Sequence, residues 1–202
     1  MKYIPKIPQP TVTEVENYLN KWNSLENYVL QERSLDKLFF ETYPKNNDIN
    51  DILIKCSSLN DFYSTNIFSI FPVAKHILDL NIDDRLRKGD PTLVNDIARM
   101  AISGKDKNFY SFATKYCSHH NPKEFPIYDS FVDKVLWHFK KVDKFARFTR
   151  NELKEYEKFK NVLLEFKKVY KIEQYNLKDL DRYLWQLGKD YFPRQYKKKN
   201  EA

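Results

Sequence analysis

The sequence predicts an all-α protein, and three observations support that fold class. Apolar residues recur at helical spacing along most of the chain, whereas the alternating pattern of a half-buried strand is hard to find. The 202 residues include three glycines, Gly89, Gly104 and Gly188, which are too few for the turns of a β-sandwich or a doubly wound fold. Hydrophobic residues make up 42% of the chain, which is enough for a core. We therefore expect residues 1–202 to form a single helical domain.

The first half of the chain predicts an extended lead-in followed by helices. Residues 1–10 contain three prolines and form the lead-in. Thr13 with Glu16 matches a capping box at the start of the first helix, and Ser34 is a candidate cap for the second. The helical patterns of this half cover residues 13–32, 35–43, 48–63 and 70–80. Residues 81–90 follow them as a charged connection that can contain a short helical turn.

The second half predicts further helices and ends in a basic tail, residues 194–202. Asp90 is placed to cap a helix that begins at Pro91 and ends at Gly104. The next helix, residues 107–118, carries an apolar stripe centred between Phe109 and Phe112. The remaining helical patterns cover residues 130–141, 151–170 and 177–192, and Pro193 stops the last of them.

Charge and composition restrict the partners and the compartment. The formal net charge is +7 and the isoelectric point is about 9.1, which favours a polyanionic partner such as nucleic acid. The two cysteines, Cys56 and Cys117, are too few for a four-thiolate metal site and fit buried free thiols in a reducing compartment. The chain starts without an apolar signal core, and its longest uncharged apolar stretch, "IFSIFPVA", is too short to cross a bilayer. We expect a cytoplasmic protein with no membrane partner.

Lys115 and Asp129 are the candidate chemical groups. At 100° per residue, Lys107, Ser111 and Lys115 form a row on the polar side of the predicted helix. Lys115 can therefore reach into a groove or remain an ordinary solvated lysine. Asp129 precedes a helix, where its carboxylate accepts backbone N–H bonds and meets the positive end of the helix dipole. Such a fixed anion suits a helix cap, a group that stabilises positive charge, or both.

The order helix, hairpin, helix, then an aspartate at the start of the next helix resembles the helix-hairpin-helix DNA glycosylases. The segment "PIYDSFVDKVL" is similar to the one that carries the catalytic aspartate of that superfamily. Within the superfamily the chain most resembles the small 8-oxoguanine glycosylase branch. The segments "LNDFYSTNIFSIFPVAKHI" and "LDRYLWQLGKDYF" look like parts of bacterial proteins with this glycosylase fold. The resemblance covers about residues 50–192 and implies a two-lobed helical bundle.

The resemblance also implies an activity, namely excision of a damaged base such as 8-oxoguanine from double-stranded DNA. The amine of Lys115 would attack the sugar C1′ as the base leaves, and Asp129 would stabilise the developing positive charge. The resulting Schiff base can proceed to strand cleavage, and neither a metal nor an organic cofactor is implied. The other candidate residues are Gly104, Lys105, Lys107 and Ser111 for DNA contacts, and His119 and Trp185 for the base pocket.

Two departures from the family pattern keep other interpretations open. The family hairpin has glycines on either side of one apolar residue, whereas this chain offers Gly104 alone. Counting back from Asp129 places the family lysine near Ser111, one turn before Lys115. The alternatives are a non-catalytic DNA-binding module on the same scaffold and a helical interaction protein whose positive charge is incidental. Core packing is the alternative role for Trp185.

Overall fold

The structure is a computed structural model that describes residues 6–193 of the 202-residue chain. The predicted basic tail and the first half of the lead-in lie outside the described residues. The described part is mostly helical, as predicted, and its elements in chain order are α1 (Val12–Asn23), α2 (Glu26–Asp36), the π-helix η1 (Lys37–Thr42), α3 (Ile49–Phe62), α4 (Ile70–Asp79), α5 (Asp83–Lys88), α6 (Thr92–Ala98), β1 (Arg99–Ile102), β2 (Lys105–Asn108), α7 (Tyr110–His120), α8 (Ser130–Val142), the 3₁₀ helix η2 (Arg150–Lys154), α9 (Tyr156–Val169) and α10 (Leu177–Tyr191).

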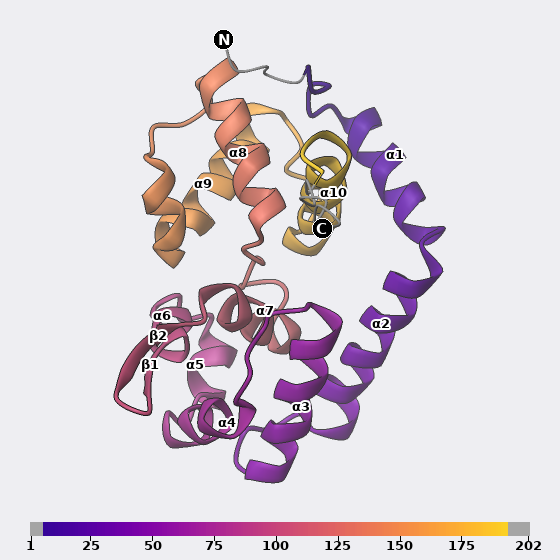
Figure 1. Ribbon diagram of the computed structural model, residues 1–202. Helices are drawn as coiled ribbons and strands as arrows, with labels where there is room; N and C mark the ends of the chain where they lie inside the picture. The colour runs from indigo at the N-terminus through magenta and orange to yellow at the C-terminus, as the bar shows by residue number, and fades with distance from the viewer. Residues whose placement is uncertain (1–5, 194–202) are drawn as a thin grey trace, which may run out of the picture.

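The helices are arranged in two lobes. Helix α2 runs along one side of the molecule and connects the lobe that contains α1 to the lobe that contains α3 (Figure 1). One lobe contains α3 to α7 and the β-hairpin, and the other contains α1, α8, α9 and α10. The first and last described helices, α1 and α10, pack together. The hydroxyl of Tyr18 on α1 donates a hydrogen bond to Asp190 on α10 at 3.0 Å. Lys21 pairs with the same carboxylate at 2.7 Å. This pairing places the N- and C-terminal helices in the same lobe.

The predicted boundaries of the first helices are wrong. Residues 13–32 form two helices and not one, because the hydroxyl of Ser24 donates to the Lys21 carbonyl at 2.7 Å and α1 ends there. Thr11 caps α1 by accepting a bond from the Glu14 N–H, so Thr13 lies inside the helix. Ser34 also lies inside a helix, where its hydroxyl donates to the Leu30 carbonyl instead of capping a new one.

A β-hairpin replaces the predicted helix end and helix start between residues 99 and 108. β1 and β2 pair antiparallel, with Ile102 opposite Lys105. The two turn residues between them, Ser103 and Gly104, have φ values of +50° and +72°, which suit a two-residue hairpin turn. Lys107 is therefore a strand residue and does not share a helical row with Lys115. Both strands are short and largely exposed, so no alternating apolar pattern marked them in the sequence.

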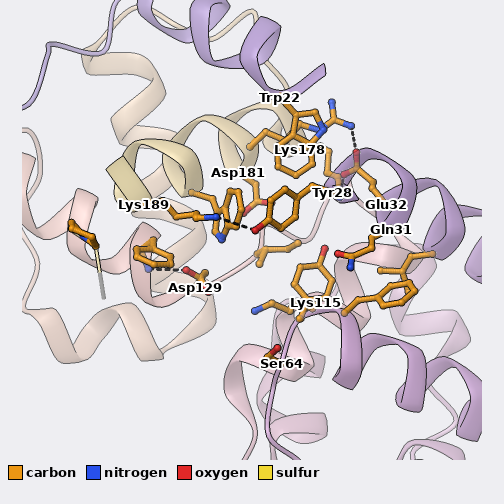
Figure 2. Close-up of a pocket in the computed structure, with 18 residues that line it drawn as sticks. Trp22, Tyr28, Gln31, Glu32, Ser64, Lys115, Asp129, Lys178, Asp181 and Lys189 are labelled. Atoms are coloured by element: carbon orange, nitrogen blue, oxygen red, sulfur yellow. Dashed lines mark hydrogen bonds and ion pairs between the residues drawn. The ribbon is translucent and has the colours of Figure 1, made fainter. Parts of the chain in front are cut away.

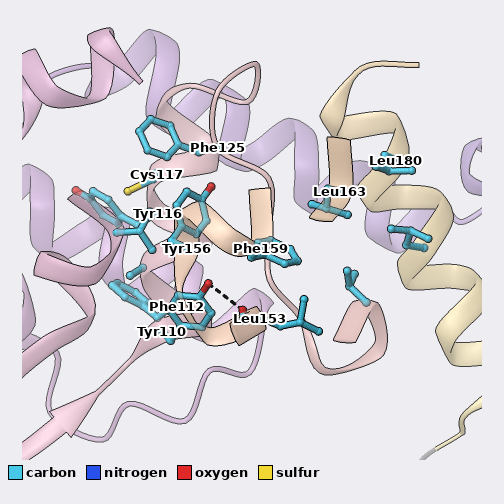
Figure 3. Packing of buried hydrophobic residues seen from close by; sticks show 14 of the residues in the cluster. Tyr110, Phe112, Tyr116, Cys117, Phe125, Leu153, Tyr156, Phe159, Leu163 and Leu180 are labelled. Atoms are coloured by element: carbon cyan, nitrogen blue, oxygen red, sulfur yellow. Dashed lines mark hydrogen bonds between the residues drawn. The ribbon is translucent and has the colours of Figure 1, made fainter. Parts of the chain in front are cut away.

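Helix α7 lies at the centre of the molecule and carries much of the aromatic core (Figure 3). Nine of its eleven residues are buried, so it has no solvated face of the kind that the sequence predicted. Phe112 and Tyr116 of the predicted apolar stripe are almost wholly buried, whereas Phe109 is the half-buried residue just before the helix. Tyr110 donates to the Leu153 carbonyl at 3.2 Å and so ties α7 to η2. This central position brings the polar side chains of α7 to the boundary between the lobes.

The two histidines at the end of α7, His119 buried and His120 half-buried, predict loss of stability in acid. Burial lowers the pKa of His119 to about 4, and the pKa of His120 also lies well below its ordinary value because of burial. Between pH 6.5 and 4 the unfolded chain therefore binds protons that the folded chain does not. The free energy of unfolding should fall over this range, by on the order of 3 kcal/mol from His119 alone. Urea unfolding at a series of pH values measures this loss.

A matched variant isolates the contribution of His119. The Nε2 atom of this histidine lies 3.0 Å from the hydroxyl of Tyr63, and a glutamine amide can reach the same partner without titrating. The His119→Gln variant should therefore lose less stability than the native chain as the pH falls. Identical pH dependence in the two proteins would show that His119 is not responsible.

None of the helices in the described part of the chain combines the length and the apolar character needed to cross a membrane.

Candidate functional site

A cavity of about 480 Å³ lies between the two lobes (Figure 2). Side chains reach it from α1, α2, α7, the start of α8 and α10, so segments that are distant in the sequence form its walls. Lys115 and Asp129, the two residues predicted to carry the chemistry, both line it. The cavity combines ionisable side chains with a wall of aromatic rings.

Lys115 projects from the middle of α7 and is 3% exposed. Its Nζ atom lies 2.5 Å from the hydroxyl oxygen of Ser111 and 3.4 Å from the carbonyl oxygen of Tyr128. Burial lowers the pKa of the Lys115 amine, and the carboxylates of Asp129 and Asp181 oppose that effect. The sequence allowed Lys115 to reach into a groove or to remain in open water. The structure places this lysine in the wall of a cavity.

Asp129 is the N-cap of α8, as the sequence predicts. Its Oδ1 atom accepts a hydrogen bond from the backbone N–H of Phe131 at 2.7 Å. The cap fixes the carboxylate at the positive end of the helix dipole, and this position lies in the cavity wall. Asp129 therefore caps α8 and also lines the cavity that Lys115 lines.

A second carboxylate in the cavity, Asp181 on α10, was missed by the sequence analysis. Burial raises its pKa to about 7, although the nearby Lys178 and Lys115 cations oppose the change. Its side chain remains partly accessible through the cavity. Asp181 can therefore exchange a proton near neutral pH. A signal existed in the sequence, because α10 places its polar and aromatic cavity residues at helical spacing on one face, namely Lys178, Asp181, Arg182, Trp185 and Lys189.

An ion cluster joins α2 to α10 beside the cavity. The Nζ atom of Lys178 lies 2.7 Å from a carboxylate oxygen of Glu32, which also pairs with the guanidinium of Arg182. Burial opposes ionisation of Glu32, but the two cations lower its pKa below the usual range. Burial likewise disfavours the Lys178 cation, yet Tyr63 and Glu32 raise the pKa of that lysine. Lys178 therefore stays protonated, whereas burial shifts the pKa of Lys115 downward.

The aromatic wall of the cavity comes from α1, α2 and α10. The ring centroids of Tyr28 and Trp185 are 4.9 Å apart, and those of Trp22 and Trp185 are 5.9 Å apart. The Nζ atom of Lys189 lies 4.4 Å from the Trp185 centroid and donates to the Tyr28 hydroxyl at 3.0 Å. Trp185 is half-buried, packs against these rings and lines the cavity, and its predicted place in a base pocket stays a prediction.

The other predicted site residues lie elsewhere. Gly104, Lys105 and Lys107 are exposed on the β-hairpin and do not line the cavity, so their contacts with DNA stay predictions. His119 does not line the cavity either. The side chain of Tyr63, which is hydrogen-bonded to His119, lies in the cavity wall. Ser111 lines a smaller cavity of about 260 Å³, which adjoins the first at Lys115, Asp129 and the chain segment after α3.

The described residues bring no three histidine, cysteine, aspartate or glutamate side chains together in a way that could hold a metal ion. Cys56 and Cys117 are free and buried, as predicted. The ionisable groups that line the cavity include lysine amines and carboxylates. Such a set supports nucleophilic attack by an amine and the transfer of protons.

Comparison with known proteins gives one family and one relative. The model of the family described as HI_0787_N, N-terminal domain, matches residues 14–124, a segment that includes α2 and Lys115. An uncharacterized protein of Haemophilus influenzae (strain ATCC 51907 / DSM 11121 / KW20 / Rd) is 54% identical over 147 residues, which are 72% of this chain and 70% of the relative. No solved structure gave a significant match. The chain therefore belongs to the HI_0787_N family.

Proposed function

We propose that the protein is a DNA glycosylase of the helix-hairpin-helix type that excises a damaged base such as 8-oxoguanine, with Lys115 as the nucleophile. One observation carries the proposal. A buried amine whose pKa is lowered and a fixed aspartate, on separate helices, open onto one cavity with an aromatic wall. The resemblance of the segments around Asp129 and in α10 to these glycosylases supports it further.

The size and the lining of the cavity suit a base that has been turned out of a duplex. Its volume of about 480 Å³ falls among those of small-molecule sites. Stacking of a base on an aromatic side chain contributes about 1–3 kcal/mol, and Tyr28 and Trp185 offer such rings. Extruding a base costs a few kcal/mol. Stacking in this cavity can therefore offset the cost of extrusion.

Lys115 is the best nucleophile among the three lysines that line the cavity. An attacking amine must lose its proton, and burial lowers the pKa of Lys115. Lys178 is held protonated beside Glu32. Lys189 is engaged with the rings of Tyr28 and Trp185. Elsewhere in the described part of the molecule, Lys55 is also buried, but it does not line the cavity.

The proposed chemical step balances with the groups that are present. The neutral amine of Lys115 forms a bond to C1′, and the bond from C1′ to the base nitrogen breaks with its electron pair passing to the base. Asp129 stabilises the positive charge that develops on the sugar. The amine, now bonded to carbon, gives up a proton, and the leaving base gains one. Asp181 can carry that proton because its pKa lies near 7.

The distribution of charge supports a polyanionic partner. Between residues 133 and 171 the chain carries twelve lysine and arginine residues against six aspartate and glutamate residues. Most of these basic side chains are exposed, and they lie on α8, η2, α9 and the loops beside them. Contacts between such side chains and phosphates make binding fall steeply as salt rises. Phosphate contacts on this lobe would hold a duplex beside the cavity.

Borohydride trapping tests the proposed function. The full chain is incubated with a duplex that contains one 8-oxoguanine and with an undamaged duplex of the same sequence, and both are then reduced. A covalent protein–DNA adduct that forms with the damaged duplex alone supports the proposal. Salt-dependent binding to both duplexes without an adduct would favour the non-catalytic DNA-binding alternative, and failure to bind at low salt would exclude both.

A further inference from the structure

The amine of Lys115 contacts oxygen atoms of its own helix and of the segment before α8. Its Nζ atom lies 2.5 Å from the hydroxyl oxygen of Ser111 and 3.3 Å from the Ser111 carbonyl oxygen. A third oxygen, the carbonyl of Tyr128, lies 3.4 Å from the same atom. Ser111 precedes Lys115 by four residues on α7, so the helix itself brings the two side chains together.

The hydroxyl of Ser111 acts as an acceptor toward this amine. It donates its own hydrogen to the Tyr128 carbonyl at 3.2 Å, which leaves its lone pairs for an N–H of Lys115. Thr114 bonds to the same two residues, because its hydroxyl donates to the Ser111 carbonyl at 3.0 Å and accepts from the Tyr128 N–H at 3.1 Å. The serine oxygen is therefore held in place by a backbone carbonyl and a braced helical turn.

These contacts give the amine a direction. The three oxygen atoms lie on one side of Nζ, since the Ser111 hydroxyl is bonded to the Tyr128 carbonyl and the third oxygen also belongs to Ser111. A neutral amine has two N–H donors and one lone pair, and oxygen atoms attract the donors and repel the lone pair. When Lys115 is neutral, its lone pair therefore faces away from these oxygens. Lys115 lines both the larger and the smaller cavity, so the lone pair can face a ligand there.

The same oxygen atoms favour the protonated form of the amine. A bond accepted from a charged donor is stronger than one from a neutral donor, so each acceptor stabilises the cation. The carboxylates of Asp129 at the start of α8 and Asp181 on α10 act in the same direction. The ring centroid of Tyr63, the residue after α3, lies 5.2 Å from Nζ and also attracts a cation. Burial opposes these groups and lowers the pKa of Lys115. Replacing Ser111 removes the closest acceptor without changing any charge.

We propose that Ser111 is a positioning residue for Lys115, which directs the amine and sets the pH at which it becomes a nucleophile. This inference rests on the proposed function. An amine attacks in its neutral form, and attack is fastest when the lone pair already points at the reacting carbon. Loss of the serine hydroxyl should therefore leave more of the amine neutral at a given pH, while the neutral amine reacts more slowly because its direction is no longer fixed.

The experiment compares the native chain with Ser111→Ala and Ser111→Thr, of which the second keeps a hydroxyl at this position. Ser130→Ala is the matched control, because Ser130 also lines the smaller cavity but is exposed at the start of α8. Borohydride adduct formation with a duplex containing 8-oxoguanine is measured over a series of pH values. An NMR titration of the Nζ nitrogen of Lys115, assigned with Lys115→Met, follows protonation of the same amine without DNA.

Ser111→Ala should move the NMR midpoint and the rising limb of the rate profile to lower pH, by about half a unit to one unit. Its plateau rate should fall by about tenfold. Ser111→Thr should stay close to the native chain in both measurements, and Ser130→Ala should match it. An unchanged midpoint in Ser111→Ala, or an equal shift in Ser130→Ala, would overturn the role of Ser111 and leave the glycosylase intact. If the NMR midpoint moves but the native chain forms no adduct, the proposed function fails, and only the control of protonation by Ser111 survives.

Discussion

Replacing Lys115 with methionine should abolish the covalent adduct and lower base excision by about a thousandfold or more, because no other amine in the cavity replaces a missing nucleophile. Methionine has a similar unbranched stem and tolerates a buried site. Lys115 is 3% exposed, so the substitution removes an amine that is costly to bury but also its bonds to Ser111 and Tyr128, and these opposing effects should change the free energy of unfolding by no more than about 2 kcal/mol. Single-turnover excision, adduct yield and thermal unfolding measure these effects.

Lys189→Met is the matched control for this prediction. Lys189 is another lysine of the cavity wall, but its Nζ atom lies over the Trp185 ring and bonds to Tyr28. Its loss should weaken stacking on the aromatic wall without removing the nucleophile, so the adduct should still form. An adduct that survives in Lys115→Met and disappears in Lys189→Met would assign the nucleophile to the other lysine.

The second large effect is expected at Asp129, where two substitutions separate capping from catalysis. Asparagine is as good an N-cap as aspartate, so Asp129→Asn should keep the bond to the Phe131 N–H and preserve stability. It removes the negative charge, however, and should slow base excision by on the order of a hundredfold to a thousandfold. Asp129→Ala should lose the same activity and about 1 kcal/mol of stability as well.

Excision rates and urea unfolding of both Asp129 variants provide the test. Loss of activity in Asp129→Asn at native stability is the result that a catalytic charge requires. If Asp129→Asn keeps full activity and Asp129→Ala is merely less stable, the aspartate is a helix cap and nothing more. Tyr128 and Ser130 flank the site and remain unchanged in both variants.

Local signals in the sequence were sufficient to predict several helices and the helix cap at Asp129. The N-cap role of Asp129 follows from the residue type and from the apolar pattern that comes after it, and the structure confirms it. Pro193 follows the end of α10, and α3, Ile49–Phe62, matches the pattern predicted over residues 48–63. These features depend on residues within one or two turns of each other, so tertiary contacts do not change them.

Features that depend on tertiary contacts could not be predicted in the same way. Glu32 and Lys178 meet only because α2 and α10 come together, and nothing near either residue in the sequence indicates the other. The raised pKa of Asp181 likewise results from burial between the lobes. Helical spacing assigned Lys115 to a polar side without showing that α7 is enclosed on nearly all sides. The cavity is a product of packing.

Mapping the modified residue tests the central claim most directly. After reduction with borohydride in the presence of a duplex containing 8-oxoguanine, the adduct is digested and the peptide that carries the sugar remnant is identified by mass spectrometry. We predict that the remnant lies on the side chain of Lys115. A remnant on Lys178, on Lys189 or on the terminal amine, or the absence of any modified peptide, would contradict the proposal that Lys115 is the nucleophile in this cavity.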